Sequence, residues 1–241
     1  MRALVLGASL VLVGCGHEPL GHYADEIVEA PGATGVSYGD PTRAVNGVRG
    51  GGTHAGSLDV YSLDDRERTH LVLAFSARTI TNTPGPDLVV FENGFQETSR
   101  DAFFMDPVIV EVSRDGARWL AFPHDYVAAD ETVYEPYPEA WDGFAGVTPV
   151  VVNVDRDPMD PLSPTAGGDA FDLDELTGET DDDRALAAEM KREGVRYVRL
   201  SSASRAINPD TGVAYPRDPV SDGADIDGVA ARTLAPIDGS P

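Results

Sequence analysis

Short apolar runs separated by turn-forming residues are the feature that most restricts the fold of this chain. Runs of roughly four to eight residues, the length of typical strands, alternate with clusters of Gly, Pro, Asp and Asn. The predicted strands cover residues 58–63, 71–75, 88–91, 108–112, 119–122, 150–154, 195–200 and 226–231. With 25 Gly and 18 Pro in 241 residues, this pattern predicts an all-β chain.

One helix is expected late in the chain. Three acids, Asp181–Asp183, precede an amphipathic stretch that ends in Lys191 and Arg192, and Gly194 follows. Acids at the start, bases at the end and a glycine beyond match the polarity of a helix. Short strands, long polar connections and a single short helix together predict one domain with the architecture of a jelly-roll β-sandwich.

The N-terminus has the pattern of an export signal. Arg2 is followed by an uncharged run over residues 3–13, which is shorter than the roughly 20 residues that cross a bilayer but suits a signal-peptide core. The run ends in Leu12-Val13-Gly14-Cys15, which resembles the bacterial lipobox, whose cysteine is acylated after cleavage. The alternative is a buried N-terminal strand with an inert cysteine. We expect a signal peptide at 1–14, a tether at 15–37 that is lipidated at Cys15, a domain at 38–236 and a tail at 237–241.

The charge balance argues against nucleic acid as a partner. The chain has 41 Asp and Glu against 18 Lys and Arg, a net charge of −23. Nucleic acid is therefore not an expected partner, because no basic stripe is present to contact phosphates. The lone Cys excludes a disulfide framework. We expect a cell-envelope protein held by lipid at the outer membrane or cell surface, or on the periplasmic face.

Acidic residues gather in two short segments that predict a calcium site. Asp169, Asp172 and Asp174 form the first, and Asp225 and Asp227 belong to the second. Calcium takes six to eight oxygens from carboxylates, carbonyls and water, and closely spaced aspartates supply them. Alternatively, these acids are solvated surface charge or bond backbone N–H groups in turns.

A third polar group surrounds one predicted strand: Asp87 precedes the strand, and Glu92-Asn93 ends it. We include these three residues among the candidate ligand-binding positions.

Asp172 and Asp227 stand between apolar residues, where an unpaired carboxylate would be costly. Each of these two carboxylates therefore needs a cation or a set of hydrogen-bond donors. Arginine partners would serve as well as calcium, and the candidates are Arg196, Arg199 and Arg232.

The aromatic residues fall into two sets. Phe91, Trp119, Phe171 and Tyr197 alternate within predicted strands and are expected in the core. The Pro-containing segment 133–144 is loop-like. Its aromatic residues could stack on sugar rings, or the segment could fold over one sheet to cover an apolar patch. The candidate sugar-binding residues there are Tyr134, Tyr137 and Trp141.

Catalytic patterns are sparse. The chain has no Gly-x-Ser-x-Gly elbow and no phosphate-binding glycine loop, and its five His residues lack the spacing of a zinc pair. Two carboxylates at glycosidase spacing remain conceivable, because so many acids are present. An enzyme is not the favoured interpretation.

Several motifs together resemble an uncharacterised family of bacterial surface lipoproteins, known in spirochaetes and elsewhere, over most of residues 38–234. They are, in chain order, Gly39-Asp40-Pro41, Ala44-Val45-Asn46-Gly47, Gly56-Ser57-Leu58-Asp59-Val60, Pro84-Gly85-Pro86-Asp87, Val90-Phe91-Glu92-Asn93, Val110-Glu111-Val112-Ser113, Asp115-Gly116, Gly168-Asp169-Ala170-Phe171-Asp172-Leu173, Val195-Arg196-Tyr197-Val198-Arg199-Leu200 and Asp225-Ile226-Asp227-Gly228-Val229. The resemblance implies location and fold, since members of that family have no assigned activity.

A weaker resemblance is to the galactose-binding-like, or discoidin-type, jelly rolls. The Asn46-Gly47 loop, the Ser113–Trp119 hairpin and the Arg196–Arg199 strand carry it. That superfamily implies a non-catalytic binder of glycans, lipids or proteins, often with a structural calcium that joins the early loop to the last strand. Asn46 thereby joins the predicted calcium ligands.

The expected function is thus that of an exported, lipid-anchored binding or structural module that is stabilised by calcium. Its expected partners are the membrane and a glycan or envelope protein. The alternatives are a calcium-dependent glycan hydrolase and a purely architectural envelope protein.

Overall fold

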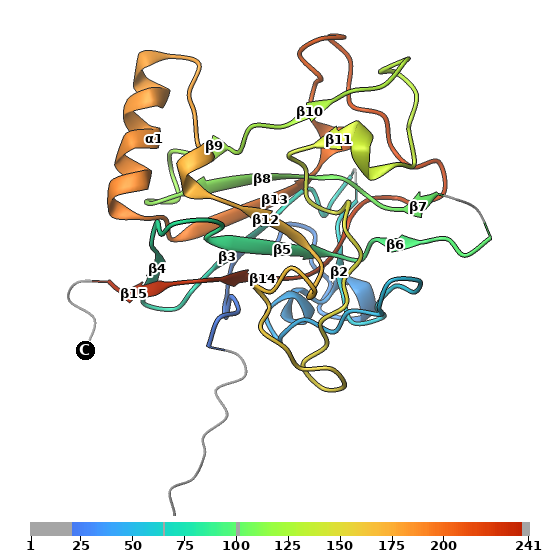
Figure 1. Cartoon of the computed structure of the whole chain (residues 1–241), viewed down its shortest axis with the longest axis horizontal. Coiled ribbons are helices and arrows are strands. Elements are labelled where there is room, and N and C mark those ends of the chain that lie inside the picture. The colour runs from blue at the N-terminus through green and yellow to red at the C-terminus, as the bar shows by residue number, and fades with distance from the viewer. Residues whose placement is uncertain (1–20, 65, 100–101, 238–241) are drawn as a thin grey trace, which may run out of the picture.

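Two antiparallel sheets form a β-sandwich, as predicted (Figure 1). The computed structural model describes residues 21–64, 66–99 and 102–237, so the predicted signal peptide and Cys15 lie outside the described residues. The first sheet contains, in spatial order, β1 (Glu26–Glu29), β3 (Leu71–Ala74), β13 (Tyr197–Ser202), β8 (Val108–Ser113) and β9 (Leu120–Ala121). The second contains β12 (Asp169–Phe171), β5 (Leu88–Glu92), β14 (Asp225–Ala231) and β2 (Tyr61–Ser62).

Smaller elements complete the described part of the chain. Three short strand pairs join β4 (Arg78–Ile80) to β15 (Leu234–Pro236), β6 (Phe95–Gln96) to β7 (Phe103–Phe104), and β10 (Asp125–Tyr126) to β11 (Trp141–Asp142). The 3-10 helices are η1 (Ser37–Gly39), η2 (Pro41–Ala44), η3 (Pro138–Ala140), η4 (Leu173–Glu175) and η5 (Ala203–Arg205). No helix within the described ranges is both long and apolar enough to cross a membrane.

The main core lies between the two sheets. Alternate residues of β8, such as Val110 and Val112, are buried in the same cluster as Leu88 and Val90 of β5 and Val229 of β14. Burial of each such side chain contributes roughly 1.5–3 kcal/mol. Because strand side chains alternate between faces, the residues between them on β8 and β13 are directed away from this core.

The single α-helix of the described residues, α1 (Asp181–Glu193), confirms the predicted helix. Thr180 and Asp183 form a reciprocal capping box at its start, and Gly194 follows it with a φ of 76°. These are the start and stop signals that the sequence carries. Leu186 and Met190 bury its narrow apolar face.

Three expectations about local structure need correction. The segment 150–154 is not a strand; Val150 and Val152 instead pack as loop residues on the outer face of the second sheet, against Val89 and Phe91. The expected strand at 58–63 shortens to β2. Part of the predicted tether belongs to the fold, because β1 pairs with β3 along the edge of the first sheet.

Two expected core aromatics lie on the outer face of the first sheet. Phe91 and Phe171 are buried as predicted, but Trp119 and Tyr197 are partly exposed. Tyr197 alternates with the buried Val198 along β13, so the strand's register places it on the opposite face. This outer face therefore carries aromatic side chains that were expected in the core.

Candidate functional site

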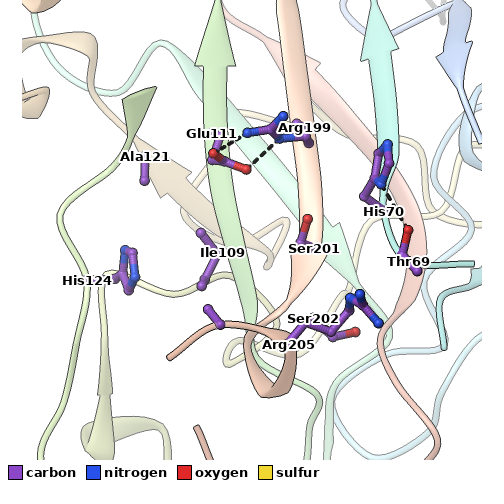
Figure 2. A pocket seen from close by; sticks show the side chains of 11 residues that line it. Thr69, His70, Ile109, Glu111, Ala121, His124, Arg199, Ser201, Ser202 and Arg205 are labelled. Carbon is purple, nitrogen blue, oxygen red and sulfur yellow. Dashed lines mark hydrogen bonds and ion pairs between the residues drawn. The ribbon is translucent and has the colours of Figure 1, made fainter. Parts of the chain in front are cut away.

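A pocket of about 450 Å³ opens on the outer face of the first sheet (Figure 2). Strands β8, β9 and β13 supply its floor, and the loops before β3 and after β9 supply its sides. We call it the sheet-face pocket; its lining residues are Thr69, His70, Ile109, Glu111, Ala121, His124, Arg199, Ser201, Ser202, Arg205 and Ala206.

A fixed ion pair occupies the pocket floor. Arg199 on β13 lies directly opposite Glu111 on β8 in the strand register. The Arg199 Nε donates to Glu111 Oε2 at 2.6 Å, and a second N–H of the guanidinium donates to Oε1. The guanidinium carbon also lies 4.4 Å from the centre of the Trp119 ring. A bidentate pair stacked on an aromatic face holds the arginine in one orientation.

His124 lines the pocket from the segment after β9 (Figure 2). Its Nδ1 lies 2.8 Å from the carbonyl oxygen of Phe122. A carbonyl only accepts hydrogen bonds, so Nδ1 carries the proton and Nε2 of the neutral ring remains an acceptor. Edge contact with Phe144, at 4.8 Å between ring centres, holds the imidazole in place.

His70 joins a hydroxyl to a carboxylate at the pocket edge. Its Nδ1 lies 3.1 Å from Thr69 Oγ1, and its Nε2 lies 3.1 Å from Glu29 Oε2. A catalytic triad also links a hydroxyl, an imidazole and a carboxylate, but with the ring nitrogens exchanged, since there Nε2 faces the hydroxyl and Nδ1 the carboxylate. Here, however, the Glu29 side chain is 61% exposed, so water competes for it and its contact with His70 is weak. The arrangement favours binding over nucleophilic chemistry.

The pocket has a different charge balance from the rest of the chain. Arg199, Arg205, His70 and His124 line it together with a single carboxylate, that of Glu111. Over the whole sequence, acids outnumber Lys and Arg by 41 to 18. The sheet-face pocket is therefore a place where an anionic group meets cationic and hydrogen-bonding side chains in an otherwise acidic protein.

Two of the predicted metal ligands have protein partners, one in a local turn and one in a distant loop. Asp172 accepts a hydrogen bond from the Asp174 N–H at 2.8 Å and caps η4. The Asp174 side chain accepts one from Asn82 Nδ2 at 2.8 Å. Asp172 is only partly buried, so the cost of an unpaired buried carboxylate does not arise there.

Asp169 and Asp227 are held by backbone N–H groups. Asp169 Oδ2 accepts from Gly146 N at 2.7 Å and Val147 N at 3.1 Å, and burial raises its pKa to about 6. Asp227 is fully buried at a bulge in β14, and both of its oxygens accept from Arg49 N, at 2.9 and 3.0 Å. Burial raises the pKa of Asp227 to about 8.

The remaining predicted ligands also have protein partners. Asn46 Nδ2 donates to Asp59 Oδ2 at 2.9 Å, and Asp225 accepts from the Ser62 hydroxyl. Across residues 21–64, 66–99 and 102–237, no group of three or more His, Cys, Asp or Glu is placed to hold a metal ion. The structure thus does not gather these predicted ligands into one site.

The arginines expected beside Asp172 and Asp227 have other partners. Arg196 pairs with Glu26 at 3.5 Å, and Arg232 Nε donates to the Pro86 carbonyl at 2.6 Å. Arg199 pairs with Glu111. The group that binds Asp227 is the main chain of Arg49, which no side-chain pattern predicts.

The segment 133–144 folds over an apolar patch, the second of the two roles considered for it. Trp141 is 1% exposed, and its Nε1 donates to the Glu135 carbonyl at 2.9 Å. The Tyr134 hydroxyl donates to the Met105 carbonyl at 2.7 Å. Tyr137 is 45% exposed. Stacking of a sugar ring on Trp141 would require this segment to open.

Asp87 and Asn93 tie loops to the ends of β5. The buried Asp87 accepts from Thr83 N at 2.8 Å and Leu173 N at 3.0 Å, while burial raises its pKa. Asn93 Oδ1 accepts from the Ser57 N–H. Glu92 differs from both, because one of its buried oxygens has no hydrogen-bond partner among the described residues.

The sequence interpretation did not find the residues of the sheet-face pocket. Glu111 and Arg199 are 88 positions apart, and only the register of β8 against β13 brings them together. The available signal was a charged residue in the middle of each apolar strand. Comparisons with protein-family models, with curated proteins and with solved structures found no match to this chain.

Proposed function

We propose that this protein is a lipid-anchored cell-surface module that binds an acidic saccharide in the sheet-face pocket, without catalysing a reaction. The observation that carries the proposal is the local reversal of charge. Two arginines and one carboxylate line this pocket of a chain whose net charge is −23, and two histidines add ring nitrogens that form hydrogen bonds. Such a reversal selects a ligand with carboxylate or sulfate groups.

The neutral side chains of the pocket suit a sugar backbone. Ser201 and Thr69 offer hydroxyls that donate and accept, and Ile109 offers an apolar surface. Arg199 is already oriented by Glu111 and Trp119, so little side-chain entropy remains to be lost on binding. A saccharide that carries both hydroxyl and carboxylate groups would use all three kinds of contact.

Membrane attachment rests on the lipobox-like sequence that ends at Cys15. Tyr23 and Ala24 are 3% and 1% exposed within the fold, so only residues 16–22 separate the acylated cysteine from packed structure. A chain of this length reaches at most about 25 Å. We infer that the domain is held close to the lipid surface. Cys15→Ala should move the protein from the membrane fraction to the soluble fraction; unchanged fractionation would exclude the anchor.

Binding is tested with the full chain purified in detergent and titrated calorimetrically with matched acidic and neutral oligosaccharides, such as oligouronates and the corresponding neutral oligomers. We expect the acidic series to bind and Arg205→Ala to weaken it about tenfold or more, because hydrogen bonds to charged groups contribute about 1.5–3 kcal/mol. Ser201→Phe should weaken it by filling the pocket. Arg192→Ala, an exposed arginine of α1 outside the pocket, is the control and should bind normally.

Three results would contradict the proposal. They are equal binding of neutral and acidic oligomers, unchanged binding by both pocket variants, and turnover of the bound saccharide. The last result would favour a hydrolase and would direct attention to Thr69, His70 and Glu29.

A further inference from the structure

Glu92 is a buried carboxylate with an unsatisfied oxygen. It ends β5, is 2% exposed, and its Oε1 accepts from Asp225 N at 3.0 Å. Its Oε2 has no hydrogen-bond partner among the described residues. A buried charged oxygen without a partner costs several kcal/mol, so a donor or a cation is required at this position.

Main-chain carbonyl oxygens lie near Glu92 Oε2, as the space beside Gly94 and Gly146 shows. A Cβ built on Gly94 would lie 3.2 Å from the Gly146 carbonyl oxygen, 3.5 Å from Glu92 Oε2 and 3.6 Å from the Phe104 carbonyl oxygen. A Cβ built on Gly146 would lie 2.6 Å from the Asp106 carbonyl oxygen and 3.2 Å from Glu92 Oε2. Main-chain carbonyls from two segments, residues 104–106 and Gly146, thus lie near one carboxylate oxygen, beside two glycines.

Further negative charge surrounds this group. Burial, and then the carboxylates of Asp106 and Asp225, hold the pKa of Glu92 well above its usual range. The groups that oppose this increase are the backbone N–H groups of Asp225 and Asn93. We call Glu92 Oε2 and the carbonyl oxygens of Phe104, Asp106 and Gly146 the Glu92 cradle.

We propose that the Glu92 cradle binds a single calcium ion that joins the end of β5 to the end of β7 and to the loop after β11. Calcium accepts backbone carbonyls, carboxylates and water in flexible geometry at 2.3–2.6 Å, which suits a donor set dominated by main-chain oxygens. Magnesium requires near-ideal octahedral geometry and releases water reluctantly, so it fits less well. This site involves none of the six residues for which the sequence predicted metal binding.

The ion has a structural role in this account. Gly146 N donates to Asp169 while Gly146 O faces the cradle, so one peptide segment lies between two carboxylates of the second sheet. A cation in the cradle fixes that segment against β5. The sheet-face pocket lies on the other sheet, and its lining includes none of the cradle residues.

The experiment measures thermal unfolding of the full chain after EDTA treatment, with and without about 1 mM CaCl2 or MgCl2. We expect calcium to raise Tm by about 5 °C or more, magnesium to have a smaller effect, and calorimetry to show one calcium ion per chain. Glu92→Gln should abolish the response. Gly94→Ala should abolish it as well, because its methyl group occupies the cradle while every carboxylate remains.

Asp227→Asn is the matched control: it alters another buried carboxylate of the same sheet, one whose oxygens already have N–H partners. This variant should keep the full calcium response. The proposal is overturned if wild type shows no calcium response, which would assign a proton to Glu92, or if both Glu92→Gln and Gly94→Ala retain it. Gly94→Ala keeps Glu92 intact. If Glu92→Gln does not fold, the calcium response of Gly94→Ala therefore still tests the proposal.

Discussion

The sheet-face pocket and the Glu92 cradle both concentrate charged groups, yet they satisfy them in opposite ways. In the pocket, Arg199 and His124 each have a protein partner and remain partly exposed. In the cradle, Glu92 is buried and one of its oxygens has no hydrogen-bond partner among the described residues. A satisfied, solvated group can exchange partners with a ligand at little cost, whereas an unsatisfied buried group needs its ligand for stability.

This difference separates two kinds of binding in one domain. Loss of a ligand from the sheet-face pocket should leave the folded state nearly unchanged, because water and existing partners remain. Loss of a cation from the cradle should destabilise the fold. Changes in the two regions should therefore affect different measurements, and the following predictions use that contrast.

The largest effect on stability is expected from Gly146→Ala. Gly146 has a φ of 85°, and a Cβ there would lie 2.6 Å from the Asp106 carbonyl oxygen. Backbone strain and crowding together should cost about 3 kcal/mol or more in the free energy of unfolding, measured by urea denaturation. Gly85→Ala is the control, because Gly85 has a φ of 82° and open space around its Cβ; it should cost about 1 kcal/mol. Equal losses in the two variants would show that the cradle is not tightly packed.

A smaller effect on the stability of the fold is expected from a change of pH. The folded-state pKa of Asp227 is about 8 and that of Asp169 about 6, both raised by burial. The folded protein therefore binds more protons than the unfolded chain between about pH 4 and 8, so stability falls as pH rises through this window. Asp115, whose pKa is lowered by N–H donors, is ionised in both states above about pH 5 and adds no slope there.

The variant Asp227→Asn isolates the contribution of Asp227 to this pH dependence. We expect the variant to be more stable than wild type at pH 8, by on the order of 2 kcal/mol, and to show a flatter dependence of Tm on pH between 5 and 8. Asp222→Asn, at an exposed position, should follow wild type. A wild-type Tm that rises from pH 5 to pH 8 would contradict the assignment of raised pKa values to the buried carboxylates.

The smallest effect on stability is expected in the pocket. Arg205 is exposed and Ser201 lies on the outer face of β13, so Arg205→Ala and Ser201→Phe should each shift Tm by no more than about 2 °C. Calorimetric scans without ligand provide the measurement. A large loss of stability in both variants would make the pocket part of the structural framework and would remove its distinction from the cradle.

Local patterns in the sequence were sufficient for the sandwich and for its helix. The alternation in β8 and the capping signals around α1 depend on neighbouring residues, and both are confirmed. The apolar run at 150–154 was misinterpreted as a strand because a loop that covers the second sheet buries the same residue types. Periodicity over a few residues does not distinguish these two cases.

The sites were less accessible to prediction because they depend on distant pairing and on the main chain. Glu111 meets Arg199 only through strand register, and the cradle is formed largely by carbonyl oxygens, which every residue carries. Asp227 was expected to need a compensating group, but that group is the Arg49 N–H rather than a side chain. Side-chain spacing alone gives no information about such partners.

The most direct measurement is a calorimetric titration of the full chain with an acidic oligosaccharide, before and after treatment with EDTA, together with Tm under both conditions. We expect the saccharide to bind in both conditions with Kd values within about twofold of each other, while EDTA lowers Tm and added calcium restores it. Failure of the acidic saccharide to bind the calcium-loaded chain, or loss of its binding together with calcium, would contradict two independent sites.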